Sequence, residues 1–272
     1  MTDDQAVRID RTNDLLTVVA IGVVAYALAN ILHESVGHGG ACIALGGRPQ
    51  VVSSVHFECG EEQISDAARR MVSAAGTIVN FLAAAVSLLA MKRQGLHRPH
   101  LAWFLWLFTT INLLMGAGYF LFSGIGNIGD WSSVFSGLLP AWVWRPLLAL
   151  IGAALYFYFA RLSARRLIVL VGSGEAAVPR AKSFAVPVYI AGGLLYCISG
   201  LFNPVGPVLI AISAAAASFG GTSGLLWLTE FVRRGSDSHP PVAVSRSVPW
   251  IIAGVIASIL FVGVLGPAVR LG

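Results

Sequence analysis

The sequence predicts an all-α polytopic membrane protein with about six to seven transmembrane helices and a short polar loop or hairpin after the first helix. Two observations support this fold class. Of the 272 residues, 56% are hydrophobic and only 11% are charged, whereas a soluble domain carries about 25% charged residues. The apolar residues also gather in runs of about 20, the length that a helix needs to cross a bilayer.

The first apolar run begins at Leu15, after a polar tail of residues 1–14, and continues to about Leu32. Because every backbone polar group in lipid needs a partner within the protein, the later apolar runs should be helical as well. They lie at 71–91, 101–123, 141–161, 185–202, 205–230 and 248–268. The count falls from seven to six if the proline- and tryptophan-rich stretch 136–161 lies in the membrane interface.

A polar loop, residues 47–70, separates the first two predicted spans. Its valines Val51, Val52 and Val55 favour extended backbone and indicate a short strand or hairpin near the membrane surface.

The distribution of positive charge predicts the orientation in the membrane. Most of the 18 Lys and Arg residues lie in the N-terminal tail and in the loops around 92–98, 161–182 and 233–246, which share one predicted side. Cytoplasmic loops carry such an excess, so we expect a cytoplasmic N-terminus in a bacterial inner (plasma) membrane. Because the charges cluster between apolar runs, we expect no nucleic-acid partner despite the net charge of +5.

Cys42, Cys59 and Cys197 are the three cysteines of the chain. They form neither a disulfide framework nor a CxxC motif. Cys42 and Cys59 would pair if both faced an oxidising compartment, but we expect free buried thiols.

The chemistry of the sequence is concentrated at the end of the first apolar run, which reads HExxxH from His33 to His38. Two neutral imidazoles can ligate zinc, and Glu34 can take a proton from water at the ion. The usual motif is HExxH, with the histidines four apart on one helix face. In an α-helix, residues five apart point about 140° away from each other. A π-helical turn would realign the histidines. Alternatively, the helix would end at Gly37 and let His38 fold back.

A catalytic zinc site needs a third protein ligand and an open position. Asp130 is the best candidate, because the predicted topology puts it on the same side as the histidines. His56 and Glu58 are weaker candidates in the polar loop. The remaining ionisable residues considered fall on the opposite side, and these are His97, His100, His239 and Glu230.

Three segments resemble the site-2 proteases, a family of intramembrane zinc metallopeptidases. The stretch LHESVGHGGACIALGGR from Leu32 to Arg48 resembles the first zinc motif of that family, with one extra residue before Gly37 and His38. The stretch AGTIVN, which ends at Asn80, resembles the Gly-Pro-x-x-Asn helix, with Thr77 in place of proline. Asn112, followed by Gly129 and Asp130, resembles the segment that supplies the third zinc ligand.

The resemblance covers residues 15–135, which would form the metallopeptidase core, and leaves 136–272 as additional transmembrane helices. It implies that Glu34 is the general base, that His33, His38 and Asp130 hold Zn²⁺, and that Asn80 contacts the oxyanion or the substrate. The expected partners are membrane lipid and a transmembrane or membrane-anchored peptide, which the enzyme would cleave. Two alternatives remain: a zinc-dependent hydrolase of a lipid or small molecule, and a non-enzymatic transporter or scaffold.

Overall fold

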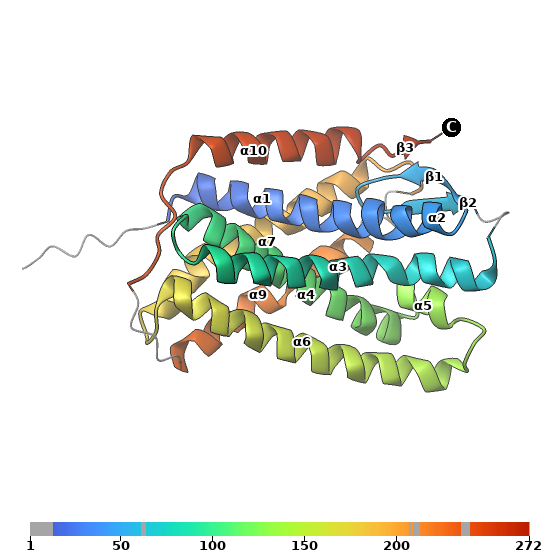
Figure 1. Ribbon diagram of the computed structural model, residues 1–272, viewed down its shortest axis with the longest axis horizontal. Coiled ribbons are helices and arrows are strands. Elements are labelled where there is room, and N and C mark those ends of the chain that lie inside the picture. Colours follow the sequence, from blue (N-terminus) through green and yellow to red (C-terminus); the bar gives the residue numbers. More distant parts are fainter. Residues whose placement is uncertain (1–12, 61–63, 207, 209–212, 235–239, 272) are drawn as a thin grey trace, which may run out of the picture.

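The structure is a computed structural model that describes residues 13–60, 64–206, 208, 213–234 and 240–271. Its long helices lie side by side along one axis (Figure 1). The first is continuous from Leu15 to Ala44 and consists of α1 (Leu15–Ile31), a π-helical segment η1 (Leu32–Gly39) and α2 (Gly40–Ala44). The other long helices are α3 (Asp66–Gln94), α4 (Pro99–Gly126), α6 (Ala141–Val171) and α7 (Ala177–Leu201).

These five helices are long and apolar enough to cross a membrane, and they confirm five of the seven expected spans. Residues 141–161 belong to the 31-residue helix α6, which is itself long enough to span. The run 248–268 forms a shorter apolar helix, Val248–Val264, made of α10 (Val248–Ser258) and η5 (Ile259–Val264). The run 205–230 lies partly outside the described residues. Its described part is broken into η3 (Ala216–Gly220), α9 (Gly224–Trp227) and the start of η4 (Leu228–Arg234).

The helix surfaces are those of an integral membrane protein. The outward face of α3 consists of exposed apolar side chains, Ile78, Leu82, Val86 and Leu89. Its inward face buries small and polar residues, Gly76, Thr77, Asn80, Ala84 and Ser87. A water-soluble helix shows the opposite distribution. The pattern therefore directs apolar side chains to lipid and polar side chains to the interior of the bundle.

The helix α1 occupies the centre of the bundle and packs against α4, α7 and α10. Its Tyr26 is fully buried, and the Tyr26 backbone carbonyl accepts a hydrogen bond from the Tyr196 hydroxyl at 2.9 Å. A Cβ atom on Gly192 would come within 2.3 Å of the Tyr26 ring, so only glycine allows α7 to approach this closely. The site-bearing segment η1 therefore continues from a helix that is packed closely on several sides.

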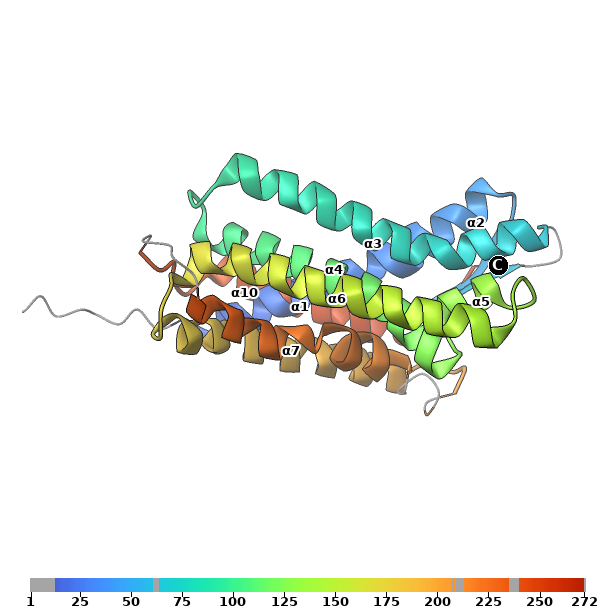
Figure 2. The same ribbon diagram turned by 90° about the horizontal axis from the view of Figure 1, so that it is seen from below.

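The polar loop forms the expected hairpin, with β1 (Arg48–Val52) antiparallel to β2 (Phe57–Gly60). The strand β3 (Val269–Arg270), near the C-terminus, pairs with the other edge of β1, so the sheet order is β2-β1-β3. Val51 and Val52 lie in β1, as expected, whereas Val55 lies in the connection between the strands. Figures 1 and 2 show this sheet at the same end of the bundle as α2 and the short helix α5 (Asp130–Phe135); we call it the hairpin end.

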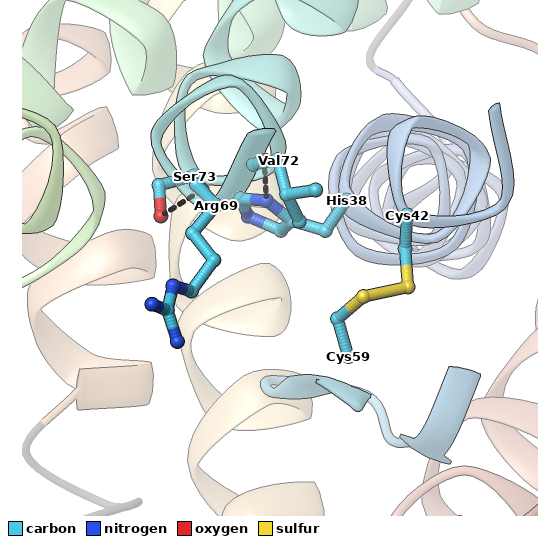
Figure 3. Close-up of a disulfide and its surroundings, with 6 residues drawn as sticks. All are labelled: His38, Cys42, Cys59, Arg69, Val72 and Ser73. Carbon is cyan, nitrogen blue, oxygen red and sulfur yellow. Dashed lines mark hydrogen bonds between the residues drawn. A yellow bond between two sulfur atoms is a disulfide. The ribbon is translucent and has the colours of Figure 1, made fainter. Parts of the chain in front are cut away.

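The expectation of free thiols is wrong for Cys42 and Cys59, which form a disulfide with a Cα–Cα distance of 6.0 Å. The bridge joins α2 to β2 (Figure 3). A glycine allows it: a Cβ atom on Gly47 would lie 2.5 Å from the Cys59 sulfur and 2.8 Å from the Cys42 sulfur. The turn after α2 thus folds the hairpin back onto the helix, a contact that spacing alone did not reveal. Cys197 is free.

The disulfide predicts both a thiol count and a stability. Alkylation of the denatured protein should modify one thiol before reduction and three afterwards, as measured by mass spectrometry. The double variant Cys42→Ser/Cys59→Ser should lose about 3 kcal/mol of stability, because the bridge closes a loop of about 17 residues, and should melt earlier in detergent. Cys197→Ser is the matched control and should melt like the wild type. Three reactive thiols before reduction would contradict the pairing.

Candidate metal centre

The segment η1 aligns the two histidines of the HExxxH motif, although they are five residues apart. It is π-helical from Leu32 to Gly39, and the wider π turn brings residues five apart back to one face. The imidazole rings of His33 and His38 are consequently neighbours, with centroids 4.8 Å apart. The π-helical interpretation is confirmed, and the alternative of a helix end at Gly37 is wrong, since the helix continues into α2.

Two glycines set the distance between η1 and α3. A Cβ atom on Gly37 would lie 2.6 Å from the Cα atom of Gly76, so the two backbones touch at this crossing. A Cβ atom on Gly76 would in turn lie 2.6 Å from the Nε2 atom of His33 and 2.7 Å from that of His38. The bare backbone of Gly76 therefore leaves the space in which the two imidazoles meet.

His33, His38 and Asp130 form a group that could hold a metal ion. The Nε2 atoms of the two histidines are 3.2 Å apart. The Oδ2 atom of Asp130 lies 3.1 Å from Nε2 of His33 and 3.4 Å from Nε2 of His38. Both histidines are buried, whereas the Asp130 side chain is 20% exposed. The three ligand atoms thus form a small triangle with one side open.

The hydrogen bonds of the other ring nitrogens orient both imidazoles. His33 donates from Nδ1 to the Asn80 side-chain oxygen at 2.6 Å. Asn80 donates to Asn112 at 2.8 Å, which donates to the Phe108 carbonyl at 2.8 Å. His38 donates from Nδ1 to the Val72 carbonyl at 2.7 Å, the contact drawn beside the disulfide in Figure 3. Such partners fix the tautomer of metal-binding histidines.

The tautomers make the triangle chemically suitable for a cation. With Nδ1 protonated on each neutral ring, both Nε2 atoms present lone pairs toward each other and toward a carboxylate oxygen. Three acceptors this close repel one another unless a positive charge lies between them. The ligand atoms of a tetrahedral zinc ion, at about 2.0–2.1 Å from the metal, are separated by about 3.3 Å, close to the three observed distances. The donor set therefore fits zinc.

Asp130 reaches the histidines because α5 begins at this residue and docks on α3. The indole N–H of the next residue, Trp131, donates to the Thr77 hydroxyl of α3 at 3.1 Å. From α3, the Arg70 guanidinium donates to the Val134 carbonyl of α5. These contacts place the Asp130 carboxylate where it could serve as an oxygen ligand beside the two histidines.

A cavity of about 660 Å³ reaches the triangle at His38 and Asp130 and is lined by residues of η1, the hairpin, α3, α4 and α5. The buried carboxyl group of Glu34 lies in its wall together with His38 and Asp130. The ring of Tyr119, from α4, also lines the cavity and stacks on His33 with centroids 4.4 Å apart and planes inclined by 11°. The arrangement combines a metal-binding triangle with an acid–base group and room for a ligand.

Among the described residues, the other candidates do not join the triangle. Asn80 is close to the site. Its side-chain oxygen accepts from His33, and its nitrogen donates to Asn112 and to the Ala29 carbonyl. His56 and Glu58 line the cavity as a pair 3.1 Å apart, outside the ligand group. His100 bonds to the Ser245 carbonyl at the opposite end, and His239 lies outside the described residues.

Sequence reasoning missed Tyr119 and the structural role of Gly76. Gly76 stands in a segment that was singled out, but only the packing of α3 on η1 shows that a side chain there would fill the site. Tyr119 follows Asn112 by two helical turns, and this spacing puts both residues on the same face of α4; it is the one signal that could have found it.

Comparisons with protein-family models, with curated proteins and with solved structures find no match to this chain. Any statement about its function therefore rests on the residues and their geometry.

The close approach of Gly76 to the two histidines predicts that metal binding can be lost without replacing any of the three ligand residues. Gly76→Ala should abolish zinc binding, because its Cβ atom would occupy the space of the His33 and His38 rings. The metal content of the purified protein, measured by plasma mass spectrometry, checks this. Gly40→Ala is the matched control: it also changes a helical glycine, but nothing lies within 4 Å of its Cβ position, and it should retain about one zinc per chain. Full zinc occupancy in Gly76→Ala would contradict the site.

Proposed function

We propose that this chain is an intramembrane zinc metallopeptidase that cleaves a transmembrane or membrane-anchored peptide segment. The observation that carries the proposal is the convergence of His33, His38 and Asp130 into one group that could hold a metal ion. Glu34, His38 and Asp130 line one cavity beside it, at the end of an apolar helix long enough to span a bilayer. Ionisable residues at such a depth are costly, and they are usually kept for function.

The composition of the site supports a catalytic rather than a structural ion. Structural zinc sites close on four protein ligands, commonly with cysteines, whereas catalytic sites use three protein ligands and leave a position open. Here two imidazoles and one carboxylate converge, and the described chain offers no fourth ligand to the group. The cavity lies on the open side of the triangle.

Each residue has a distinct task in peptide hydrolysis. His33, His38 and Asp130 hold the ion, while Asn80 and the Val72 carbonyl keep the imidazoles in the ligating tautomer. When bound, zinc supplies Lewis acidity and makes hydroxide available from water near neutral pH. Glu34 removes the proton from the attacking water and delivers it to the nitrogen of the departing amine. The peptide carbonyl carbon gains the water oxygen and loses its bond to nitrogen, so the peptide is split into a carboxylate and an amine without an oxidant or reductant.

Two independent observations support a site that opens toward the extracytoplasmic face. The loops rich in Lys and Arg lie at the end of the bundle opposite the hairpin, as the positive-inside rule expects of a cytoplasmic side. The Cys42–Cys59 disulfide lies at the hairpin end, and disulfides persist in oxidising compartments. The substrate segment would thus enter from that face, and the N-terminus of the enzyme would be cytoplasmic.

The decisive experiment compares Glu34→Gln with His38→Ala. His38→Ala should lose zinc, because two ligands no longer hold the ion. Glu34→Gln should keep about one zinc per chain yet lose at least about 100-fold in activity, the usual contribution of general acid–base catalysis. Metal analysis gives the first result. Profiling of new peptide N-termini in membranes of cells that express each form gives the second.

New N-termini within or beside transmembrane segments, present with the wild type and absent with Glu34→Gln, are the expected outcome. Zinc that depends on His38 without any such peptides would refute proteolysis and favour hydrolysis of a lipid or small molecule. A wild-type protein free of zinc, even after supplementation, would refute both enzymes and leave a transporter or scaffold.

The orientation is tested with cysteines placed at the two ends of the bundle. In a Cys197→Ser background, Leu138→Cys should react in intact cells or spheroplasts with a maleimide that cannot cross the membrane, because the exposed Leu138 lies at the hairpin end. Lys92→Cys, at the opposite end, should react only after the membrane is permeabilised. The reverse labelling pattern would invert the proposed topology.

A further inference from the structure

Hydrolysis of a peptide needs a donor that the ligand triangle does not provide. As the attacking oxygen joins the carbonyl carbon, the carbonyl oxygen gains negative charge, and enzymes commonly aim a hydrogen-bond donor at this position. The amide of Asn80 is already engaged, since its oxygen accepts from His33 and its nitrogen donates to Asn112 and to the Ala29 carbonyl. A donor that acts beside the metal ion would therefore come from another wall of the cavity.

Several polar groups of the cavity are already engaged. The Arg70 guanidinium donates to the carbonyls of Ser133 and Val134, and His56 is paired with Glu58. Arg69 forms an ion pair with Asp66. These contacts hold the hairpin-side and α5-side walls in place.

Tyr119 differs from these polar groups in its position beside His33 and in its hydrogen bonding. Its ring lies parallel to the ligating ring of His33 and lines the same cavity as Glu34, His38 and Asp130. Within the described part of the chain, no hydrogen-bond partner is found for its hydroxyl group, and this oxygen is not among the atoms that are both buried and unpaired. The hydroxyl is therefore open to the cavity. A phenol with a pKa near 10 is a protonated donor at neutral pH.

We propose that Tyr119 is a further catalytic residue, whose hydroxyl donates a hydrogen bond to the substrate carbonyl oxygen as it becomes negatively charged. This inference rests on the proposed peptidase function. When water adds to the carbonyl carbon, the π electrons move to the oxygen that Tyr119 faces, and Glu34 takes the proton. When the carbon–nitrogen bond breaks, the carbonyl re-forms and the proton goes to nitrogen. Tyr119 keeps its own proton throughout.

The stacking contact gives Tyr119 a second effect that must be separated from the first. A ring packed on His33 helps to orient that ligand whether or not it carries a hydroxyl. Tyr119→Phe keeps the ring and removes only the donor, whereas Tyr119→Ala removes both. Tyr158→Phe removes a phenol hydroxyl from an exposed position on α6 and serves as the matched control.

The test uses full-length protein loaded with Co²⁺ in place of zinc and acetohydroxamate as the probe, a small ligand whose oxygens resemble those of the hydrated peptide carbonyl. The visible spectrum of the cobalt reports the ligand set, and titration with the probe gives its Kd. Tyr119→Phe should show the wild-type spectrum and a Kd about tenfold higher, equivalent to about 1.4 kcal/mol. Tyr119→Ala should change the spectrum itself. Tyr158→Phe should match the wild type in both.

The outcomes separate this inference from the proposed function. A wild-type cobalt spectrum with an unchanged Kd in Tyr119→Phe would overturn the role of the hydroxyl and leave the metal site intact. A wild-type protein that shows no cobalt spectrum would overturn the metal site, and the assignment of Tyr119 with it. A wild-type spectrum in Tyr119→Ala would show that the stacked ring does not orient His33.

Discussion

The site depends on the crossing of η1 and α3, where Gly37 and Gly76 bring two backbones into contact. This contact places the Val72 carbonyl within reach of His38 and the Asn80 amide within reach of His33. It also leaves, between the helices, the volume that the two imidazoles fill. A side chain at either glycine would separate the helices and break the hydrogen bonds together, because the same helix pair supplies all of them.

The low polarity of the surroundings explains why the polar groups form connected chains. A buried polar group without a partner costs about 1–3 kcal/mol, and few waters are available inside a helix bundle in lipid. The chain from His33 through Asn80 and Asn112 to the Phe108 carbonyl satisfies each donor in turn. It ends on the one side where no protein donor is supplied, at the converging Nε2 atoms and Asp130. A cation there would complete the network, and its binding would then be coupled to folding.

The hairpin end is stabilised by connections that are distant in sequence. The disulfide holds β2 against α2, and β3 from the C-terminal region pairs with β1. The connection between β1 and β2 is held to α7, because the Ser199 hydroxyl of that helix donates to the Ser54 hydroxyl at 2.6 Å. The hairpin wall of the cavity is thus tied to the first, fifth and last helical segments of the bundle, which suits a site that must hold its shape beside lipid.

Much of the architecture follows from local features of the sequence. Apolar runs of sufficient length determined where five spanning helices lie, because lipid accepts a backbone only when its hydrogen bonds are satisfied internally. The HExxxH spacing indicated that a regular helix could not align His33 with His38. It left two possibilities, a π turn or a helix end at Gly37, and the structure has the π turn. Asp130 could be named as their partner, since topology alone limits which carboxylates reach that end of the bundle.

The remaining features depend on tertiary structure. They are contacts between segments that are distant in the chain, and nothing in the sequence pattern of one segment indicates which other segment it will contact. Cys42 and Cys59 are brought together by the turn at Gly47, and β3 is too short to show a strand period. The amide of Asn80 serves His33 instead of a substrate because Asn112, on another helix, takes its second end. The open hydroxyl of Tyr119 exists only where α4 passes the ring of His33. The sequence by itself determined the membrane fold and the ligand types; the packing of one helix on another determined the distances that make those ligands a site.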